Sequence, residues 1–192
     1  FLPRIFFDRE TPEILDFVRS ARERGVEKFL CGNIGQIRLL QQEGVEIHGD
    51  FGLNVFNSAA AEFYEEAGLA SQVLSFELNA AQLRALRGEN RGMIAYGRLP
   101  FMVTENCVKK QHHKPEGLTD RIGKTFLVTC EYGCRNAVWN SDPLYLADRD
   151  LSDAAFLQLI FTDETPRTAA QILSEYAGGT PCFREGMTRA HF

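Results

Sequence analysis

The amino-acid sequence predicts an α/β protein built on a parallel sheet. Short apolar runs alternate with helix-like runs, and the apolar runs recur at intervals of roughly 20 residues. This layout is typical of right-handed βαβ units, in which each helix returns the chain to the same end of the sheet. The alternation breaks at residues 96–140 and resumes after them. We therefore expect a regular α/β scaffold that carries a β-rich insert.

The composition is that of a globular protein. A chain of 192 residues with 44% apolar and 24% charged residues can bury a sizeable core. The net charge of −5 argues against a strongly basic nucleic-acid surface, although it does not exclude RNA held by another region. No apolar run approaches the roughly 20 residues that span a bilayer, and no signal peptide is visible. Five cysteines, an odd number, favour a reducing compartment, so we expect a cytoplasmic protein without membrane contact.

Start and stop signals for helices recur along the chain and separate the predicted strands. Thr11 followed by Pro12 is a helix start signal, and residues 79–82 resemble a capping box. Glycines such as Gly25, Gly44 and Gly68 stand where the helical patterns end. Between the helices lie six predicted strands: residues 4–7, 28–31, 45–48, 72–76, 93–96 and 157–161.

About six parallel strands are fewer than the eight of a complete (β/α) barrel, which usually needs about 250 residues. The fold is therefore an open α/β sheet or a partial barrel. We favour the partial barrel, because the chain begins at Phe1 rather than at Met, and we therefore expect N-terminal units of the barrel to be missing. We expect residues 1–192 to be a single domain, a fragment of a larger barrel, with residues 98–150 as its β-rich insert. An open sheet edge left by truncation would allow dimer formation.

Polar side chains follow several predicted strands, where ligands gather in parallel α/β folds. His48 and Asp50 follow the third strand, Glu77 follows the fourth and Arg98 the fifth. Glu77 ranks first, because a carboxylate that ends an apolar strand is costly unless it is solvated or paired. Arg98 is a candidate partner for Glu77 or for an anionic substrate. The alternative is that these residues only cap helices and fix loops.

The insert carries residues suited to a soft metal ion. Cys130 and Cys134 lie on either side of a turn, and a strand-like segment before Cys130 leads back toward Cys107. His112 and His113 lie on the intervening polar loop. Three thiolates with an imidazole would suit tetrahedral zinc. An iron–sulfur cluster normally needs four thiolates, and ordinary thiols without any metal are the third possibility.

Several segments together resemble the collagenase-like peptidase family U32, most closely the C-terminal barrel portion of its long members. The resemblance covers essentially the whole chain and is strongest in HGDFGLNVFNS (48–58), LSFELNAAQL (74–83), YGRLPFMVTENC (96–107), LTDRIGKTF (118–126) and NSDPLYLAD (140–148). It implies a partial TIM-like (β/α) barrel. It also implies a peptidase label without an assigned mechanism, whereas several relatives act in RNA or ubiquinone hydroxylation with an iron–sulfur cluster on four cysteines.

The chain departs from the family's cysteine pattern, H-G-x-x-C-x-x-x-S-G-x-C. Tyr96 and Gly97 take the first two places, Pro100 replaces the first cysteine, and Cys107 keeps the second. The loss of one thiolate favours zinc, or no metal, over a four-cysteine cluster.

We therefore expect a peptidase domain with a cysteine-based metal site, acting on a polypeptide beside the remaining N-terminal part of the same protein. The alternatives are an iron–sulfur-dependent RNA-base hydroxylase domain and a non-catalytic portion that binds substrate.

Overall fold

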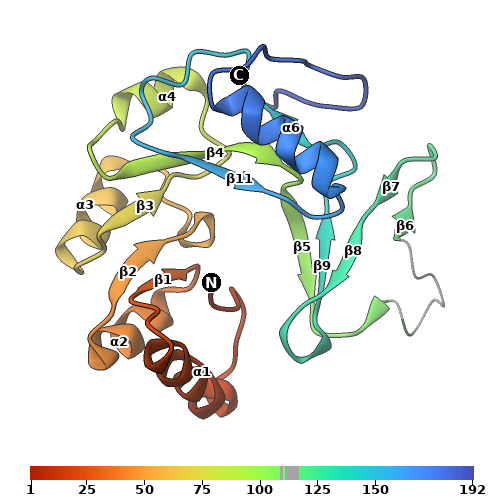
Figure 1. Cartoon of the computed structure of the whole chain (residues 1–192). Coiled ribbons are helices and arrows are strands. Elements are labelled where there is room, and N and C mark those ends of the chain that lie inside the picture. The colour runs from red at the N-terminus through yellow and green to blue at the C-terminus, as the bar shows by residue number, and fades with distance from the viewer. Residues whose placement is uncertain (109, 111–116) are drawn as a thin grey trace. The chain divides into compact units, whose positions relative to one another are not determined.

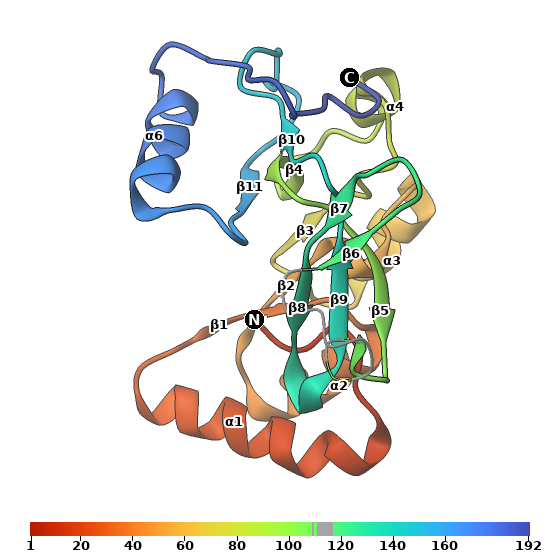
Figure 2. The same ribbon diagram turned by 90° about the vertical axis from the view of Figure 1, so that its right-hand side faces the viewer.

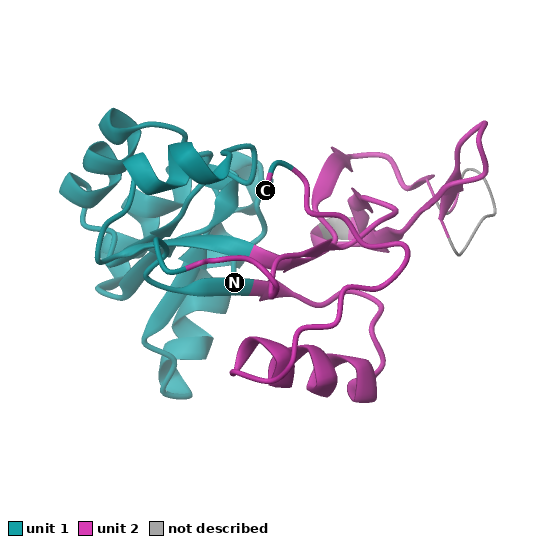
Figure 3. Ribbon diagram, turned by 90° about the horizontal axis from the view of Figure 1, so that it is seen from above, with its two compact units in different colours: residues 1–94, 152–158, 191 teal, residues 95–151, 159–190, 192 magenta. Residues whose placement is uncertain are grey.

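The computed structural model describes residues 1–108, 110 and 117–192. The chain forms two compact units, which are coloured separately in Figure 3. Unit 1 contains residues 1–94, 152–158 and 191, and unit 2 contains residues 95–151, 159–190 and 192. The division passes through two strands, β4 (Arg91–Gly97) and β11 (Leu157–Ile160).

A curled parallel sheet forms the scaffold. Its strand order is β1 (Lys28–Cys31), β2 (Glu46–Gly49), β3 (Ser71–Val73) and β4, with β11 pairing to β4. The successive pairs from β1 to β4 are parallel, and β11 runs in the same direction as β4 in Figure 1. Five parallel strands with their connecting helices confirm the expectation of a partial TIM-like barrel.

Four helices of unit 1 lie along one side of this sheet (Figure 1): α1 (Thr11–Glu23), α2 (Ile34–Glu43), α3 (Ser58–Glu66) and α4 (Ala80–Ala85). Asparagine side chains cap three of them. The predicted capping box of α4 is confirmed, because Asn79 and Gln82 each accept the other's backbone N–H at 3.0 Å. No described helix is long and apolar enough to cross a membrane.

One predicted strand is wrong. Residues 4–7 form no strand, because the backbone N–H of Phe7 is taken by the Glu10 carboxylate at 2.8 Å, where a short 3-10 helix, η1 (Asp8–Glu10), begins. Among the described residues, the parallel strands are therefore five rather than six. The segment still contacts the sheet edge, since the backbone N–H of Leu2 donates to the Leu30 carbonyl at 3.0 Å.

Unit 2 is rich in antiparallel strands. β5 (Pro100–Thr104), β9 (Asn136–Trp139) and β8 (Val128–Cys130) form a sheet with β9 in the centre, visible in Figure 2. β6 (Leu118–Thr119) pairs with β7 (Thr125–Phe126), and β10 (Leu144–Tyr145) pairs antiparallel to the end of β4.

Helix α6 (Pro166–Tyr176) packs on a core of Tyr96, Tyr145 and Ile172 within unit 2. Two tyrosine hydroxyl groups in this region donate hydrogen bonds. Tyr145 donates to the Glu175 carboxylate at 2.7 Å, and Tyr176 donates to the Ala95 carbonyl at 2.6 Å. Buried polar groups destabilise a fold unless they are paired, so these bonds fix the position of α6.

Candidate functional site

Three cysteines of unit 2 meet at one end of the β5–β9–β8 sheet. The sulfur atoms of Cys107, Cys130 and Cys134 all lie within 4.8 Å of one another. Cys130 is exposed and the other two are partly exposed, so an ion can reach the sulfur atoms from solvent. The grouping that the sequence predicted for these three residues is present.

Local structure explains why the three thiols converge. Cys130 ends β8, and β9 begins at Asn136, which is its register partner. The turn between these strands includes the 3-10 helix η3 (Tyr132–Cys134) and places Cys134 at φ 65°. This left-handed backbone is uncommon outside glycine. Cys107 follows β5, which pairs with the other edge of β9.

Asn136 connects the thiols to the sheet. It is fully buried, and its Oδ1 accepts the backbone N–H of Val108 at 2.5 Å. Its Nδ2 lies 3.4 Å from the Cys130 sulfur and 3.9 Å from the Cys107 sulfur. An amide N–H directed at sulfur stabilises a thiolate, as outer hydrogen bonds do in metal sites.

The surroundings prepare one thiol for ionisation. The backbone N–H of Lys110 lowers the pKa of the Cys107 thiol and outweighs the opposing effect of burial. A hydrogen bond to Cys107 raises the pKa of Cys134, and burial adds to this effect. Cys31 is a different case, because burial in the core of unit 1 raises its pKa to about 12. Cys31 is therefore a core thiol.

The thiol spacing fits one metal ion. Tetrahedral zinc with Zn–S bonds of ~2.3 Å holds its thiolates about 3.8 Å apart, which agrees with a group that fits within 4.8 Å. A four-iron cluster separates its thiolates farther, because each binds a different iron atom, and it normally uses four cysteines. The described residues bring three cysteines together. His112 and His113, predicted as further ligands, lie outside the described residues.

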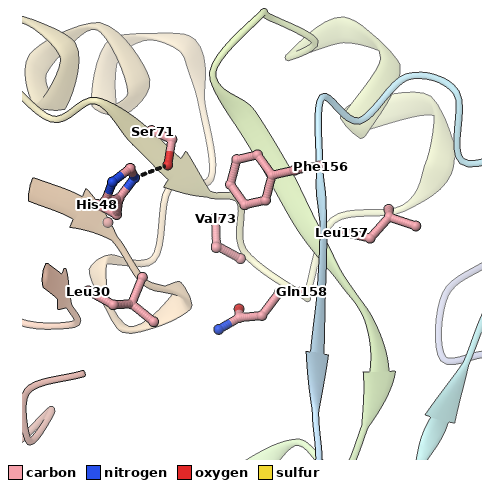
Figure 4. Close-up of a pocket in the computed structure, with 8 residues that line it drawn as sticks. Leu30, His48, Ser71, Val73, Phe156, Leu157 and Gln158 are labelled. Carbon is pink, nitrogen blue, oxygen red and sulfur yellow. Dashed lines mark hydrogen bonds between the residues drawn. The ribbon is translucent and has the colours of Figure 1, made fainter. Parts of the chain in front are cut away.

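In unit 1, His48 lies next to a serine that the sequence did not single out. The Nδ1 atom of His48 on β2 is 2.7 Å from the Ser71 hydroxyl on β3. Both residues line a pocket of about 440 Å³, shown in Figure 4. Leu30, Val73, Phe156 and Gln158 also line it.

Asp50 lies at the carboxyl end of β2, as predicted. Its Oδ1 accepts the backbone N–H of Phe51 at 2.9 Å, which caps the 3-10 helix η2 (Phe51–Leu53). The same oxygen accepts Nε2 of Gln158 at 3.0 Å. Burial raises the pKa of Asp50 and outweighs these two hydrogen bonds. Asp50 thus has both a capping role and a contact with a pocket residue.

The other two predicted catalytic residues have different surroundings. Glu77 is exposed beyond β3, and its backbone N–H lies 3.4 Å from the Ser75 hydroxyl. Arg98 belongs to unit 2, where its Nε donates to Asp163 at 3.0 Å and its Nη1 to the Asn140 carbonyl at 3.0 Å. Among the described residues, the carboxylate that Arg98 pairs with is therefore Asp163.

Ser71, Gln158 and Asn136 were not identified from the sequence. The register of the parallel sheet places Ser71 opposite His48, and sequence patterns do not give that register. Asn136 lies only two residues after Cys134, so its nearness to the cysteines was a usable signal.

A partial (β/α) barrel with a cysteine-rich antiparallel module defines a class of α/β proteins able to bind a metal ion through thiolates. The chain belongs to Peptidase family U32, whose profile matches residues 2–135. It is also similar to an uncharacterized protease of Methanocaldococcus jannaschii, with 32% identity over 79 residues. That alignment covers 41% of this chain and 18% of the length of the relative. A search of solved structures gave no significant match.

Proposed function

We propose that this chain is part of a peptidase and that it holds one zinc ion through Cys107, Cys130 and Cys134. The observation that carries the peptidase proposal is the family match over residues 2–135. A relative named as a protease supports it. The substrate that this proposal implies is a polypeptide.

The zinc ion is proposed to have a structural role. All three ligands come from one antiparallel module, and zinc there would join the end of β8 to the segment after β5. Thiolate-rich sites are typical of structural zinc. Three negative ligands also reduce the Lewis acidity of the ion, which makes it a poor activator of water. His112 and His113 remain our proposed sources of the fourth ligand.

The thiol spacing favours this zinc site over the iron–sulfur cluster that an RNA-base hydroxylase would need. The third possibility is a portion that binds substrate without cleaving it, and an assay of gelatin cleavage distinguishes it from a peptidase.

His48, Asp50, Glu77 and Arg98 remain our proposed catalytic residues. The test is cleavage of gelatin by the full-length protein and by the variants His48→Gln, Asp50→Asn, Glu77→Gln and Arg98→Met. Glu62→Gln, on an exposed position of α3, is the matched control. We expect cleavage by the wild type and the control, and a loss of about 100-fold or more where an acid or base is removed. Absence of cleavage by the wild type with every divalent metal supplied would contradict a peptidase and support a substrate-binding portion.

A further inference from the structure

The contact between His48 and Ser71 has the geometry of a general base next to a nucleophile. The two residues are register partners on adjacent parallel strands, and their Nδ1 and Oγ atoms are 2.7 Å apart. This distance lies within the range in which an imidazole can accept a hydroxyl proton. Ser71 is partly exposed and lines the pocket, so its hydroxyl can meet a ligand there.

Glu46 favours the form of His48 that can act as a base. Its Oε1 lies 3.0 Å from the Nε2 of His48, although the two atoms are not aligned as a hydrogen bond. Nearness to a carboxylate favours a proton on Nε2, because a lone pair there would face negative charge. In a neutral imidazole, Nδ1 then carries the lone pair that accepts the Ser71 hydroxyl proton. The Nζ atom of Lys28 lies 3.4 Å from the same Glu46 oxygen, so this carboxylate lies between a lysine and the His48 ring.

The pocket supplies the other features of a binding site. Leu30, Val73 and Phe156 give the pocket apolar walls (Figure 4). Gln158 also reaches the pocket, and its Oε1 is buried with no hydrogen-bond partner among the described residues. A buried carbonyl oxygen without a partner is costly, and a ligand N–H group would satisfy it. The pocket therefore suits an apolar group next to an amide.

We propose that Ser71 is a nucleophile and His48 its general base in an acyl-transfer site for amides or esters with an apolar acyl group. This proposal rests on the proposed function, because the amide that the site would cleave is then a peptide bond of the substrate. Ser71 Oγ bonds to the carbonyl carbon while Nδ1 of His48 takes its proton. The carbon–nitrogen bond then breaks, and Nδ1 gives the proton to the leaving amine. Water next adds its oxygen to the acyl carbon, and its proton passes through His48 to the departing Ser71 oxygen.

The first experiment is covalent labelling with a tagged fluorophosphonate, which reports an activated serine without a known substrate. We expect one phosphonylated peptide, containing Ser71, and no label in Ser71→Ala. The labelling rate of His48→Gln should fall by about 100-fold or more. Ser58→Ala, which removes an exposed serine at the start of α3, should label like the wild type. Circular dichroism and melting temperature establish that each variant is folded.

Glu46 is a positioning residue in this proposal, and nitrogen NMR of the His48 ring tests its role. The wild type should show the tautomer protonated at Nε2, and Glu46→Gln should shift the population toward Nδ1–H and slow labelling. A purely structural role would leave the tautomer unchanged.

Gelatin cleavage by the same variants separates this proposal from the proposed function. Label at Ser71 without cleavage of gelatin supports the acyl-transfer site and contradicts the peptidase. Cleavage that persists in Ser71→Ala overturns the acyl-transfer site and leaves the peptidase standing. Absence of label at Ser71 in the folded wild type also overturns the acyl-transfer site.

Discussion

Asn136 shows how one buried amide can serve both folding and metal binding. Its Oδ1 holds the backbone N–H of Val108, next to Cys107 in the chain, and its Nδ2 is directed at the Cys130 sulfur. A carboxamide suits this position because it donates to sulfur and accepts from backbone at the same time. An alanine would keep neither bond.

Asn136→Ala should therefore weaken zinc binding by about 10- to 100-fold, the usual effect of losing an outer hydrogen-bond partner. Competition with a chromophoric chelator measures this affinity. Asn106→Ala is the matched control, because Asn106 is exposed and only its backbone carbonyl takes part in a described hydrogen bond. Equal affinity of the Asn136 variant and the wild type would contradict the role given to this amide.

At the residue scale, the sequence identified the three cysteines but not their neighbours. The turn between Cys130 and Cys134 was a local signal. The contact between His48 and Ser71 depends on the stagger of two strands joined by a helix, which local patterns do not contain.

Among the elements, β4 and the segment leading into β11 make a close contact at a glycine. The backbone N–H of Met93 donates to the Phe156 carbonyl at 3.2 Å, and the Phe156 ring lies over Gly92. A Cβ atom at Gly92 would lie 2.4 Å from that ring. Only glycine fits this position without a shift of the aromatic side chain.

Gly92→Ala should lower the free energy of unfolding by about 1–3 kcal/mol, the usual effect of overpacking. Urea denaturation followed by circular dichroism gives this value. Gly88→Ala is the control, because the nearest atoms to its Cβ belong to the flexible side chain of Arg91, at 3.2 Å. If both variants were equally stable, the ring of Phe156 would not be packed against Gly92 as described.

The element pattern was largely predictable because each helix has local start and stop signals. Asn79 and Gln82 identified α4, and Gly44, at φ 65°, ends α2 as expected. β3 is shorter than predicted, because Leu74 forms an isolated bridge with Val55 from a loop far away in sequence. Such a tertiary contact leaves no local pattern.

For the molecule as a whole, acid stability should depend on carboxylates of unit 2 that accept hydrogen bonds from neighbouring side chains. Burial raises the pKa of Glu175, but hydrogen bonds from Tyr145 and Arg184 outweigh it and hold the pKa below its ordinary value. Asp163 is similar, with Arg98 as the group that outweighs burial. A carboxyl group whose pKa is lowered by folding stabilises the folded state at pH values above its unfolded-state pKa. This stability is lost as the pH falls through the folded-state pKa.

The melting temperature of the wild type should accordingly fall as the pH drops below about 4. Glu175→Gln should melt at a lower temperature than the wild type at pH 7 and lose less on acidification, because it has no proton to bind there. Scanning calorimetry at pH 7, 5 and 4 measures both effects. An equal acid-induced decrease in the two proteins would contradict the assignment of stability to this carboxylate.

At this scale, the periodic alternation of strands and helices predicted a parallel α/β sheet, and the resemblance to the family implied that this sheet is a partial barrel. It did not predict that residues 95–151 and 159–190 form a compact unit of their own. That unit depends on contacts such as Tyr145 with Glu175, which join residues distant in sequence.

The central claim, a single zinc ion on Cys107, Cys130 and Cys134, is tested most directly by metal analysis of protein purified without chelator. Absorption spectra of the same anaerobic samples would be recorded in parallel. We predict one zinc per chain, no visible absorption band, and loss of the zinc in Cys130→Ser. Iron with a visible absorption band, or no bound metal at all, would contradict the claim.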